Sequence, residues 1–286
     1  MAIRELTERT AMDNKIYCST GAFIGTANNR NYNLIAESKG LLNCSGYEFM
    51  MFGSWNECVD ELEESLKNSG CEFRVFHFDK TIGDRLSRNE NDDFDEAYRL
   101  FEMNCRLGET IGAELGVFHL WGGLASDKNI DFNIAQYDRL REIARKHNIL
   151  LTIENVVCNV ENPFVHLNSL HEKYPDISVT IDTRFTEFHG MTRELFSAEN
   201  AWLWDGAVKH VHFSDYSGGV KDWANLRALE LGTGQIDFDY IADNLQRVGY
   251  DGSITLESTC IEPYLNIERI NRNLDYIKRK LDERNG

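Results

Sequence analysis

The sequence lacks the features that mark a secreted, membrane-spanning or multidomain protein. It has only three prolines among 286 residues, and no Pro-rich or Ser/Gly-rich stretch that would serve as a linker. Its seven cysteines are spread singly without a C-x-x-C pair, which argues against a disulfide framework or a zinc ribbon. No apolar run approaches the roughly 20 residues that span a bilayer, and the charged N-terminus lacks a signal-peptide apolar stretch. We therefore expect a soluble, cytoplasmic protein.

Basic side chains are also scarce. The 47 acidic and 30 basic residues give a formal charge of −17. Nucleic-acid affinity rests largely on Lys and Arg that neutralise phosphates, so this balance argues against a nucleic-acid partner. The same negative field would be repelled by anionic membranes, and we expect no membrane partner.

Eight short runs rich in apolar and β-branched residues recur along the chain, each followed by a longer segment. Several of these segments have helical periodicity. In the last one Ile267, Ile270 and Leu274 begin an apolar stripe with steps of three and four residues. Another stripe starts at Phe238, with Asp237 as N-cap and Gly249 as C-cap. We expect strands in the eight runs, which are Lys15–Ser19, Gly46–Met51, Phe73–Phe78, Leu115–Leu120, Ile149–Glu154, Ile177–Asp182, Val208–Phe213 and Gly252–Glu257.

This alternation favours an α/β fold with parallel strands, because parallel neighbours need a crossover connection. Eight units closed in a ring make a single (β/α)₈ TIM barrel. A doubly wound open sheet is the competing architecture, but it usually has a G-x-G-x-x-G turn after its first strand, and Thr20-Gly21-Ala22-Phe23 is not one. Nothing marks a domain boundary, so we expect one domain over residues 1–286, with residues 1–14 as an N-terminal extension.

Seven of the eight expected strands carry a carboxylate or an imidazole near the carboxyl end, where the active site of such a barrel lies. At a single strand end such a residue is easily structural. Several carboxylates in one small mouth would raise one another's pKa values unless a cation compensated them. A divalent metal is the simplest such cation, and mostly oxygen ligation suits Mn²⁺, Mg²⁺ or Co²⁺ without excluding Zn²⁺. The residues are Glu48, His77, His119, Glu154, Asp182, His212 and Glu257.

The order and spacing of several segments resemble a known family. These segments are ILLTIEN, ISVTIDT, VKHVHFSD and GYDGSITLE, together with LGTGQIDF before the eighth strand. The sequence is similar to the xylose-isomerase-like TIM barrels, which include sugar-phosphate isomerases and epimerases, ketose 3-epimerases, inosose dehydratases and endonuclease IV. The resemblance implies one metal ion bound by Glu154, Asp182, His212 and Glu257. It also implies that Glu154 and Glu257 act as acid and base on opposite faces of the substrate.

Further residues are expected around the substrate. His77 and His119 look like the family's imidazoles on the substrate or metal side. We also expect substrate contacts from Trp121, Glu48, Arg184 and Asp215. His210 points to the same side as His212 but one layer deeper, so we place it in the core or behind the metal ligands. Other basic residues near strand ends are interpreted as solvated loop charge, namely Lys80, Arg85, Lys209 and Lys221.

One departure from the family pattern affects the metal count. Many members have a His three residues after the strand-six Asp, where this sequence has Phe185. His189 lies four residues further, and we interpret it as a loop residue. The segment after Asp215 contains no His, although the endonuclease members use an Asp-x-His pair there to complete a three-zinc cluster. We therefore do not expect three metals.

The favoured hypothesis is a divalent-metal-dependent isomerase or epimerase that acts on a small sugar, sugar phosphate or related polyol. It would abstract a proton beside a metal-polarised carbonyl. A dehydratase of the inosose or dehydroshikimate type on the same site is the nearest alternative. An abasic-site endonuclease and a non-catalytic binding barrel are weaker ones. The substrate, the metal identity and a homo-oligomeric state stay open at this stage.

Overall fold

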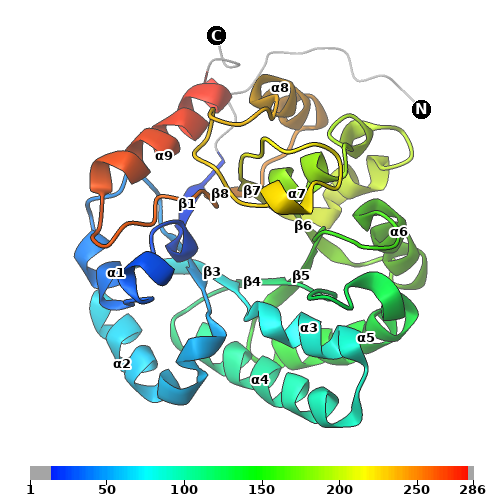
Figure 1. Ribbon diagram of the computed structural model, residues 1–286, viewed down its shortest axis with the longest axis horizontal. Coiled ribbons are helices and arrows are strands. Elements are labelled where there is room, and N and C mark those ends of the chain that lie inside the picture. The colour runs from blue at the N-terminus through cyan, green and yellow to red at the C-terminus, as the bar shows by residue number, and fades with distance from the viewer. Residues whose placement is uncertain (1–13, 283–286) are drawn as a thin grey trace.

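Strand pairing follows directly from the apolar runs. The computed structural model describes residues 14–282, and it contains a closed barrel of eight strands in sequence order. Every neighbouring pair is parallel, including β8 with β1, so the predicted (β/α)₈ barrel is confirmed (Figure 1). The strands are β1 Ile16–Ser19, β2 Tyr47–Met50, β3 Phe73–His77, β4 Leu115–Phe118, β5 Leu150–Glu154, β6 Ser178–Asp182, β7 Val208–Phe213 and β8 Ser253–Leu256. The predicted N-terminal extension falls almost entirely on residues 1–13, outside the described residues.

Helices form an outer ring around the barrel (Figure 1). The expected caps of one helix are present: the Asp237 side chain accepts a hydrogen bond from the Tyr240 N–H, and Gly249 ends the helix with a φ of 70°. None of the helices in the described part of the chain is long and apolar enough to cross a membrane. The helices are α1 Asn33–Ser38, α2 Val59–Ser69, α3 Lys80–Arg88, α4 Asn91–Thr110, α5 Ile130–Lys146, α6 Pro163–Lys173, α7 Thr183–Phe188, α8 Phe238–Val248 and α9 Ile267–Asp282.

The two faces of the strands bury different kinds of side chain. Outward positions such as Ile153, Ile181 and Val211 belong to the main apolar core between the strands and the helices. Inside the barrel, Tyr17, Val75 and Val117 form a small separate apolar cluster. The next inward position toward the carboxyl end of a strand is two residues further on, and polar side chains occupy these positions. The barrel is therefore filled by apolar side chains below a buried polar layer.

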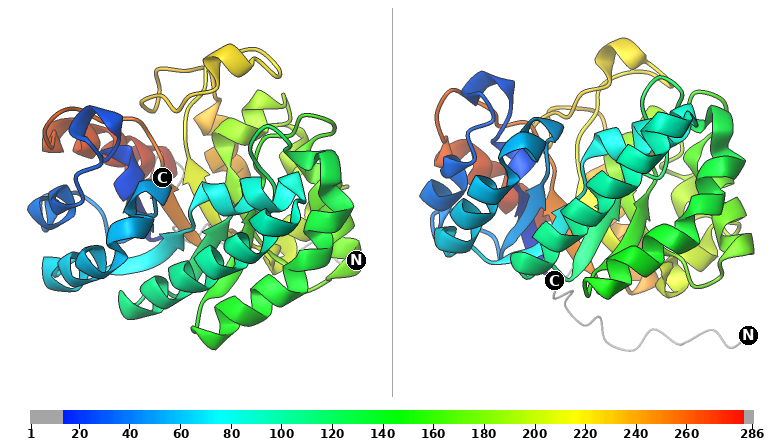
Figure 2. Two further views of the ribbon diagram at one scale, coloured as in Figure 1. Left: turned by 60° about the horizontal axis from the view of Figure 1, so that its bottom comes forward. Right: turned by 90° about the horizontal axis from the view of Figure 1, so that it is seen from below.

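The loops at the carboxyl ends of the strands build up one end of the molecule. In the side views of Figure 2, the segment between β7 and α8, which carries the short helical turn Trp223–Asn225, stands above this end. The loop after β5 is anchored differently, by the buried side chain of Asp127. Its carboxylate accepts hydrogen bonds from the backbone N–H groups of residues 159–161, and His166 Nε2 lies 2.9 Å from Asp127 Oδ2.

These hydrogen bonds stabilise the ionised form of Asp127. Burial alone would raise its pKa, but the N–H groups of Glu161 and Val160 and the His166 ring hold the pKa well below its usual range. A carboxyl group whose pKa is lowered by folding stabilises the fold at neutral pH, and this contribution is lost as acid protonates the group. Asp127 therefore ties the β5 loop to the start of α5 at neutral pH.

We predict that Asp127→Asn lowers the free energy of unfolding by about 2 kcal/mol at pH 7, because buried N–H donors lose a charged acceptor. Urea denaturation measures the change. The exposed Asp251 provides the control Asp251→Asn, which should leave stability nearly unchanged. The difference between wild type and Asp127→Asn should shrink as the pH falls below 4. Equal stability of the two variants at pH 7 would contradict the anchoring role.

Candidate metal centre

Four side chains from neighbouring strand ends meet inside the mouth of the barrel. Glu154, Asp182 and His212 lie on β5, β6 and β7, and Glu257 directly follows β8. Each is buried, and each offers one ligand atom such that all four atoms lie within 4.8 Å of one another. The strand register brings two of these side chains together, because Asp182 is paired with His212 across β6 and β7. The structure thus brings together the four residues that the resemblance implies as metal ligands.

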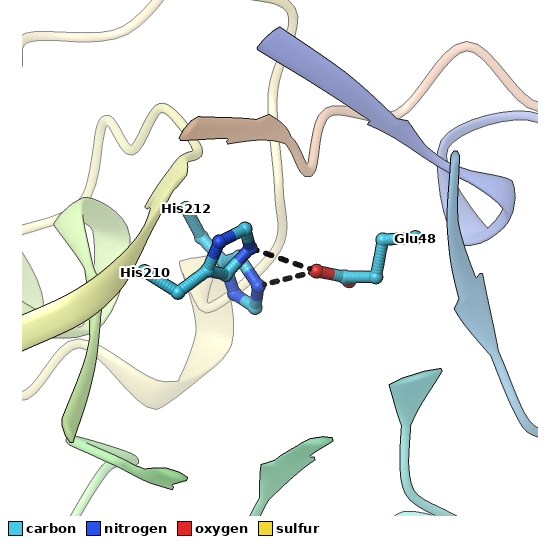
Figure 3. Close-up of side chains that lie close together, drawn as sticks. All are labelled: Glu48, His210 and His212. Carbon is cyan, nitrogen blue, oxygen red and sulfur yellow. Dashed lines mark hydrogen bonds and ion pairs between the residues drawn. The ribbon is translucent and has the colours of Figure 1, made fainter. Parts of the chain in front are cut away.

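His212 is oriented by hydrogen bonds on both sides of its ring. Its Nδ1 atom lies 2.8 Å from Glu154 Oε1 and 2.9 Å from Glu257 Oε2. Its Nε2 atom lies 2.9 Å from Glu48 Oε2, and His210 Nε2 lies 3.1 Å from the same oxygen (Figure 3). Glu48 therefore holds the far nitrogen of His212 and leaves Nδ1 facing the other carboxylates.

The expected contact of Glu48 with the substrate stays a prediction, and the structure adds contacts of Glu48 with His212 and His210. The carboxylate has no exposed surface, and one of its oxygens contacts two imidazoles that lie next to each other on β7 (Figure 3). Glu48 is placed below the strand ends, where it contacts His212 from behind. His210 lies one layer deeper than His212, beside Glu48, as its spacing from His212 predicts. Its Nδ1 atom is 2.7 Å from Ser253 Oγ.

Two more imidazoles face Glu154 from the other side. The Nε2 atoms of His119 and His77 lie 2.5 and 3.6 Å from Glu154 Oε2. His77 Nδ1 is 3.0 Å from the carbonyl oxygen of Phe78, which can only accept, so Nδ1 carries the proton. Burial lowers the pKa of His119 to about 4 despite the attraction of Glu154. These three residues form a second group whose ligand atoms lie within 4.8 Å of one another, and it shares Glu154 with the first.

Several of these polar atoms have no hydrogen bond of suitable geometry. They are Nε2 of His77 and His119, together with Oε2 of Glu154 and Glu257, and all are buried. Buried polar atoms without a partner are costly. Carboxylate oxygens and neutral imidazole nitrogens are also the atoms that coordinate divalent cations. The donor set therefore fits a bound metal ion.

The carboxylates of the cluster are unequally compensated. Although burial acts in the opposite direction, His119 and His212 hold the pKa of Glu154 well below its usual range, and Lys80 and His212 do the same for Glu257. Burial and the neighbouring Glu257 and Glu154 raise the pKa of Asp182 to about 7, although Arg184 opposes the shift. Arg184 Nη2 lies 3.4 Å from Asp182 Oδ2 and 3.8 Å from Glu257 Oε1. Lys80 Nζ lies 3.5 Å from the same Glu257 oxygen. Arg184 therefore lies beside the carboxylates, and its expected contact with the substrate stays a prediction. Lys80 is exposed, as expected of a solvated charge, but its ammonium group also faces Glu257.

Phe185 occupies the position at which the family resemblance would place a histidine. Its ring lies 4.4 Å from the Arg184 guanidinium carbon and 6.2 Å from the His119 ring. His189 instead accepts a hydrogen bond from the Cys158 N–H and holds the loop after β5. Within residues 14–282, no group of metal-binding side chains includes His189.

Two other residues expected near the substrate have packing roles. Trp121 has no exposed surface, its indole N–H donates to the Val156 carbonyl, and its ring packs against His166. Asp215 is also fully buried, and its two oxygens accept hydrogen bonds from the backbone N–H groups of residues 216, 232, 234 and 236. Their expected contacts with the substrate stay predictions. Asp215 fastens the Leu231–Phe238 segment to the end of β7.

A cavity of about 580 Å³ opens beside Glu257 and also contains two residues that the sequence reasoning missed, Arg30 and Arg227. Both lie on loops that follow barrel strands, after β1 and β7. In the sequence, only the position of Arg30 and Arg227 after expected strands could have pointed to a role near the site. Among the residues interpreted as solvated loop charge, Arg85 lies in α3 and pairs with Asp93, whereas Lys221 lies on a loop and donates to a loop carbonyl.

A closed parallel barrel with acidic and imidazole side chains at its strand ends defines the class of this protein. The chain belongs to the xylose isomerase-like TIM barrel family, whose model matches residues 42–280. No curated protein sequence matches it significantly.

Solved structures with the same fold include three relatives of low sequence identity. A D-tagatose 3-epimerase-like protein has 20% identity and a TM-score of 0.67, with 94% of this chain and 97% of that chain covered. A xylose isomerase domain protein from Alicyclobacillus acidocaldarius has 16% identity, coverages of 95% and 100%, and a TM-score of 0.68. D-psicose 3-epimerase from Clostridium cellulolyticum H10, solved with D-tagatose, has 11% identity, coverages of 93% and 99%, and a TM-score of 0.64.

The Asp215 anchor requires glycine at position 234. A Cβ atom there would lie 2.3 Å from Asp215 Oδ1 and 2.5 Å from the Tyr216 carbonyl oxygen, which is backbone and cannot rotate away. We predict that Gly234→Ala lowers the free energy of unfolding by about 1–3 kcal/mol. Gly219→Ala is the matched control, because a Cβ at Gly219 meets no atom within 4 Å. Chemical denaturation of both variants tests this, and equal stabilities would refute the close approach.

Proposed function

We propose that this protein is a divalent-metal-dependent sugar or sugar-phosphate isomerase or epimerase. The observation that carries the proposal is the buried cluster of Glu154, Asp182, His212 and Glu257, whose ligand atoms lie within 4.8 Å of one another. Membership of the xylose isomerase-like family supports it. So do the names of the structural relatives, several of which are ketose 3-epimerases.

In this proposal the four residues hold one metal ion, with Mn²⁺, Mg²⁺, Co²⁺ and Zn²⁺ as the candidates. When bound, a divalent metal polarises a substrate carbonyl and stabilises the negative charge that develops on its oxygen. His77 and His119 lie on the Glu154 side of the cluster, and Arg184 and Lys80 on the Glu257 side. The substrate would be bound between these two sets of side chains.

Glu154 and Glu257 are suited to move a proton. They come from β5 and the end of β8, strands that are not neighbours in the barrel, so they approach the mouth from different directions. One carboxylate would remove the carbon-bound proton beside the carbonyl, and the other would deliver a proton to the opposite face in an epimerisation.

We predict that the metal-loaded protein exchanges solvent deuterium into a carbon-bound position of at least one member of a ketose panel. Glu154→Gln and Glu257→Gln should each slow this exchange by about 10²–10⁴-fold, the usual contribution of a general acid or base. The exposed Glu142 on α5 provides the control Glu142→Gln, which should exchange normally. NMR spectroscopy measures the exchange.

Absence of exchange for every ketose in the panel would contradict proton abstraction from these sugars. Loss of a hydroxyl with formation of an enone absorbing in the ultraviolet would assign the site to a dehydratase instead. Unchanged exchange in both glutamine variants would contradict the assignment of acid and base.

Glu48 is predicted to be a positioning residue that acts through His212. Glu48→Ala should weaken metal binding by about 10–100-fold, the usual effect of removing the group that orients a metal-binding histidine. Glu48→Gln should restore part of the affinity, because its amide oxygen can still accept the His212 Nε2 proton. Competition with a chelator of known affinity measures the binding. Circular dichroism checks the fold of each variant. Wild-type affinity of Glu48→Ala would refute this role.

A further inference from the structure

The cavity beside Glu257 is lined by basic side chains from two loops and the start of a helix. Arg30 comes from the loop after β1, Lys80 from the start of α3, and Arg227 from the segment after β7. Glu257 is the only acidic residue among those that line this cavity. This is a local excess of positive charge in a chain whose formal charge is −17. Such a concave basic surface attracts anions.

The backbone of Arg30 is held firmly while its guanidinium group stays available. The Arg30 N–H donates to the Gly25 carbonyl at 2.8 Å, and its own carbonyl accepts from Trp55 Nε1 at 3.1 Å. The buried Asn28 side chain binds the backbone of this turn and also the Glu262 carbonyl. The guanidinium carbon lies 5.5 Å from the centre of the Phe52 ring. The loop therefore presents the Arg30 charge from a fixed base.

Arg227 is held in a comparable way on the other loop. Its N–H donates to the Asn225 carbonyl, and the Leu229 N–H two residues further donates to the Asp215 carbonyl at the end of β7. The side chain of Arg227 is exposed. Lys80 lies deeper, with its ammonium group 3.5 Å from Glu257 Oε1. The basic residues thus extend from the candidate metal centre toward the rim.

Arg30 and Arg227 differ from several other arginines in residues 14–282. Arg74, Arg88 and Arg269 each pair with two acidic side chains, and Arg141 does the same. Within residues 14–282, no ion pair joins Arg30 or Arg227 to an acidic side chain. The planar guanidinium group matches the oxygens of a phosphate or carboxylate. Two unpaired arginines in one cavity therefore suit an anionic group of the substrate.

Taking the proposed function as its basis, we propose that the substrate carries an anionic group on the end of its carbon chain remote from the reacting carbonyl. Arg30 and Arg227 bind this group, with Lys80 between the rim and Glu257. Phosphate esters and carboxylates share the required chemistry. A cavity of about 580 Å³ lies within the usual range for small-molecule sites, roughly 300–1,000 Å³. The sugars named for the structural relatives, such as D-tagatose and D-allulose, carry no such group.

Three sugars that differ only at carbon 6 test this proposal. D-Fructose carries a hydroxymethyl group there, D-fructose 6-phosphate a phosphate ester and D-fructuronate a carboxylate. Calorimetric titration of the metal-loaded protein should give at least tenfold tighter binding of one or both anions than of D-fructose. Arg30→Gln and Arg227→Gln should each weaken anion binding about tenfold, as expected for loss of a charge-assisted hydrogen bond, and leave D-fructose binding unchanged. Arg106→Gln on the exposed face of α4 is the control and should change nothing.

Comparing the affinities for D-fructose 6-phosphate and D-fructuronate shows whether the preferred anionic group is a phosphate or a carboxylate. Equal affinities for the three sugars, no binding of either anion, or wild-type anion binding in the Arg30→Gln, Arg227→Gln double variant would overturn the proposal. Arginine-dependent anion binding without deuterium exchange would support the anion site and count against the proposed isomerase. Deuterium exchange that is as fast with D-fructose as with both anions would support the isomerase and overturn the anion specificity.

Discussion

The repulsion between three carboxylates buried in one barrel mouth is the constraint around which this structure is arranged. Glu154, Asp182 and Glu257 are almost completely removed from water, where a negative charge is most costly. Arg184 and Lys80 supply positive charge from one side. Within the cluster, although burial acts in the opposite direction, Glu48, Glu154 and Glu257 raise the pKa of His212 well above its usual value, so this ring also supplies positive charge. Burial and Coulomb repulsion accordingly raise the pKa of Asp182 to about 7. A divalent cation at the centre of the cluster would remove this cost, so the same arrangement that strains the site also suits it to a metal.

The surrounding structure keeps the site in place through backbone hydrogen bonds to buried side chains. Asp215 holds the segment after β7, Asp127 holds the loop after β5, and Asn28 holds the loop after β1. Loops that carry functional residues are otherwise the least restrained part of a barrel. Because these anchors are buried, Arg30 and Arg227 extend from fixed positions even though their side chains reach solvent. This rigidity supports the proposal that both recognise one group of a substrate.

Sequence reasoning predicted the barrel and the layer of polar strand ends because both depend on short-range patterns. Strand alternation decides which side chains point inward, and parallel strands bring their carboxyl ends together, so the meeting of Glu154, Asp182 and His212 follows from their positions. The role of Glu48 did not follow, because only the barrel closure shows that its carboxylate lies behind His212. The hydrogen bonds of Asp215 and Trp121 could not be predicted, because their partners are backbone atoms of loops. The cavity of Arg30 and Arg227 depends on loop conformations that no periodicity encodes.

The central claim is that four strand-end side chains form a divalent-metal site. Crystals grown with Mn²⁺ and measured at the manganese absorption edge test it most directly. The account predicts one strong anomalous peak in contact with Glu154, Asp182, His212 and Glu257. A peak between Glu48, His210 and His212 instead, which is another group of suitable side chains, would contradict it, as would the absence of any peak in the barrel.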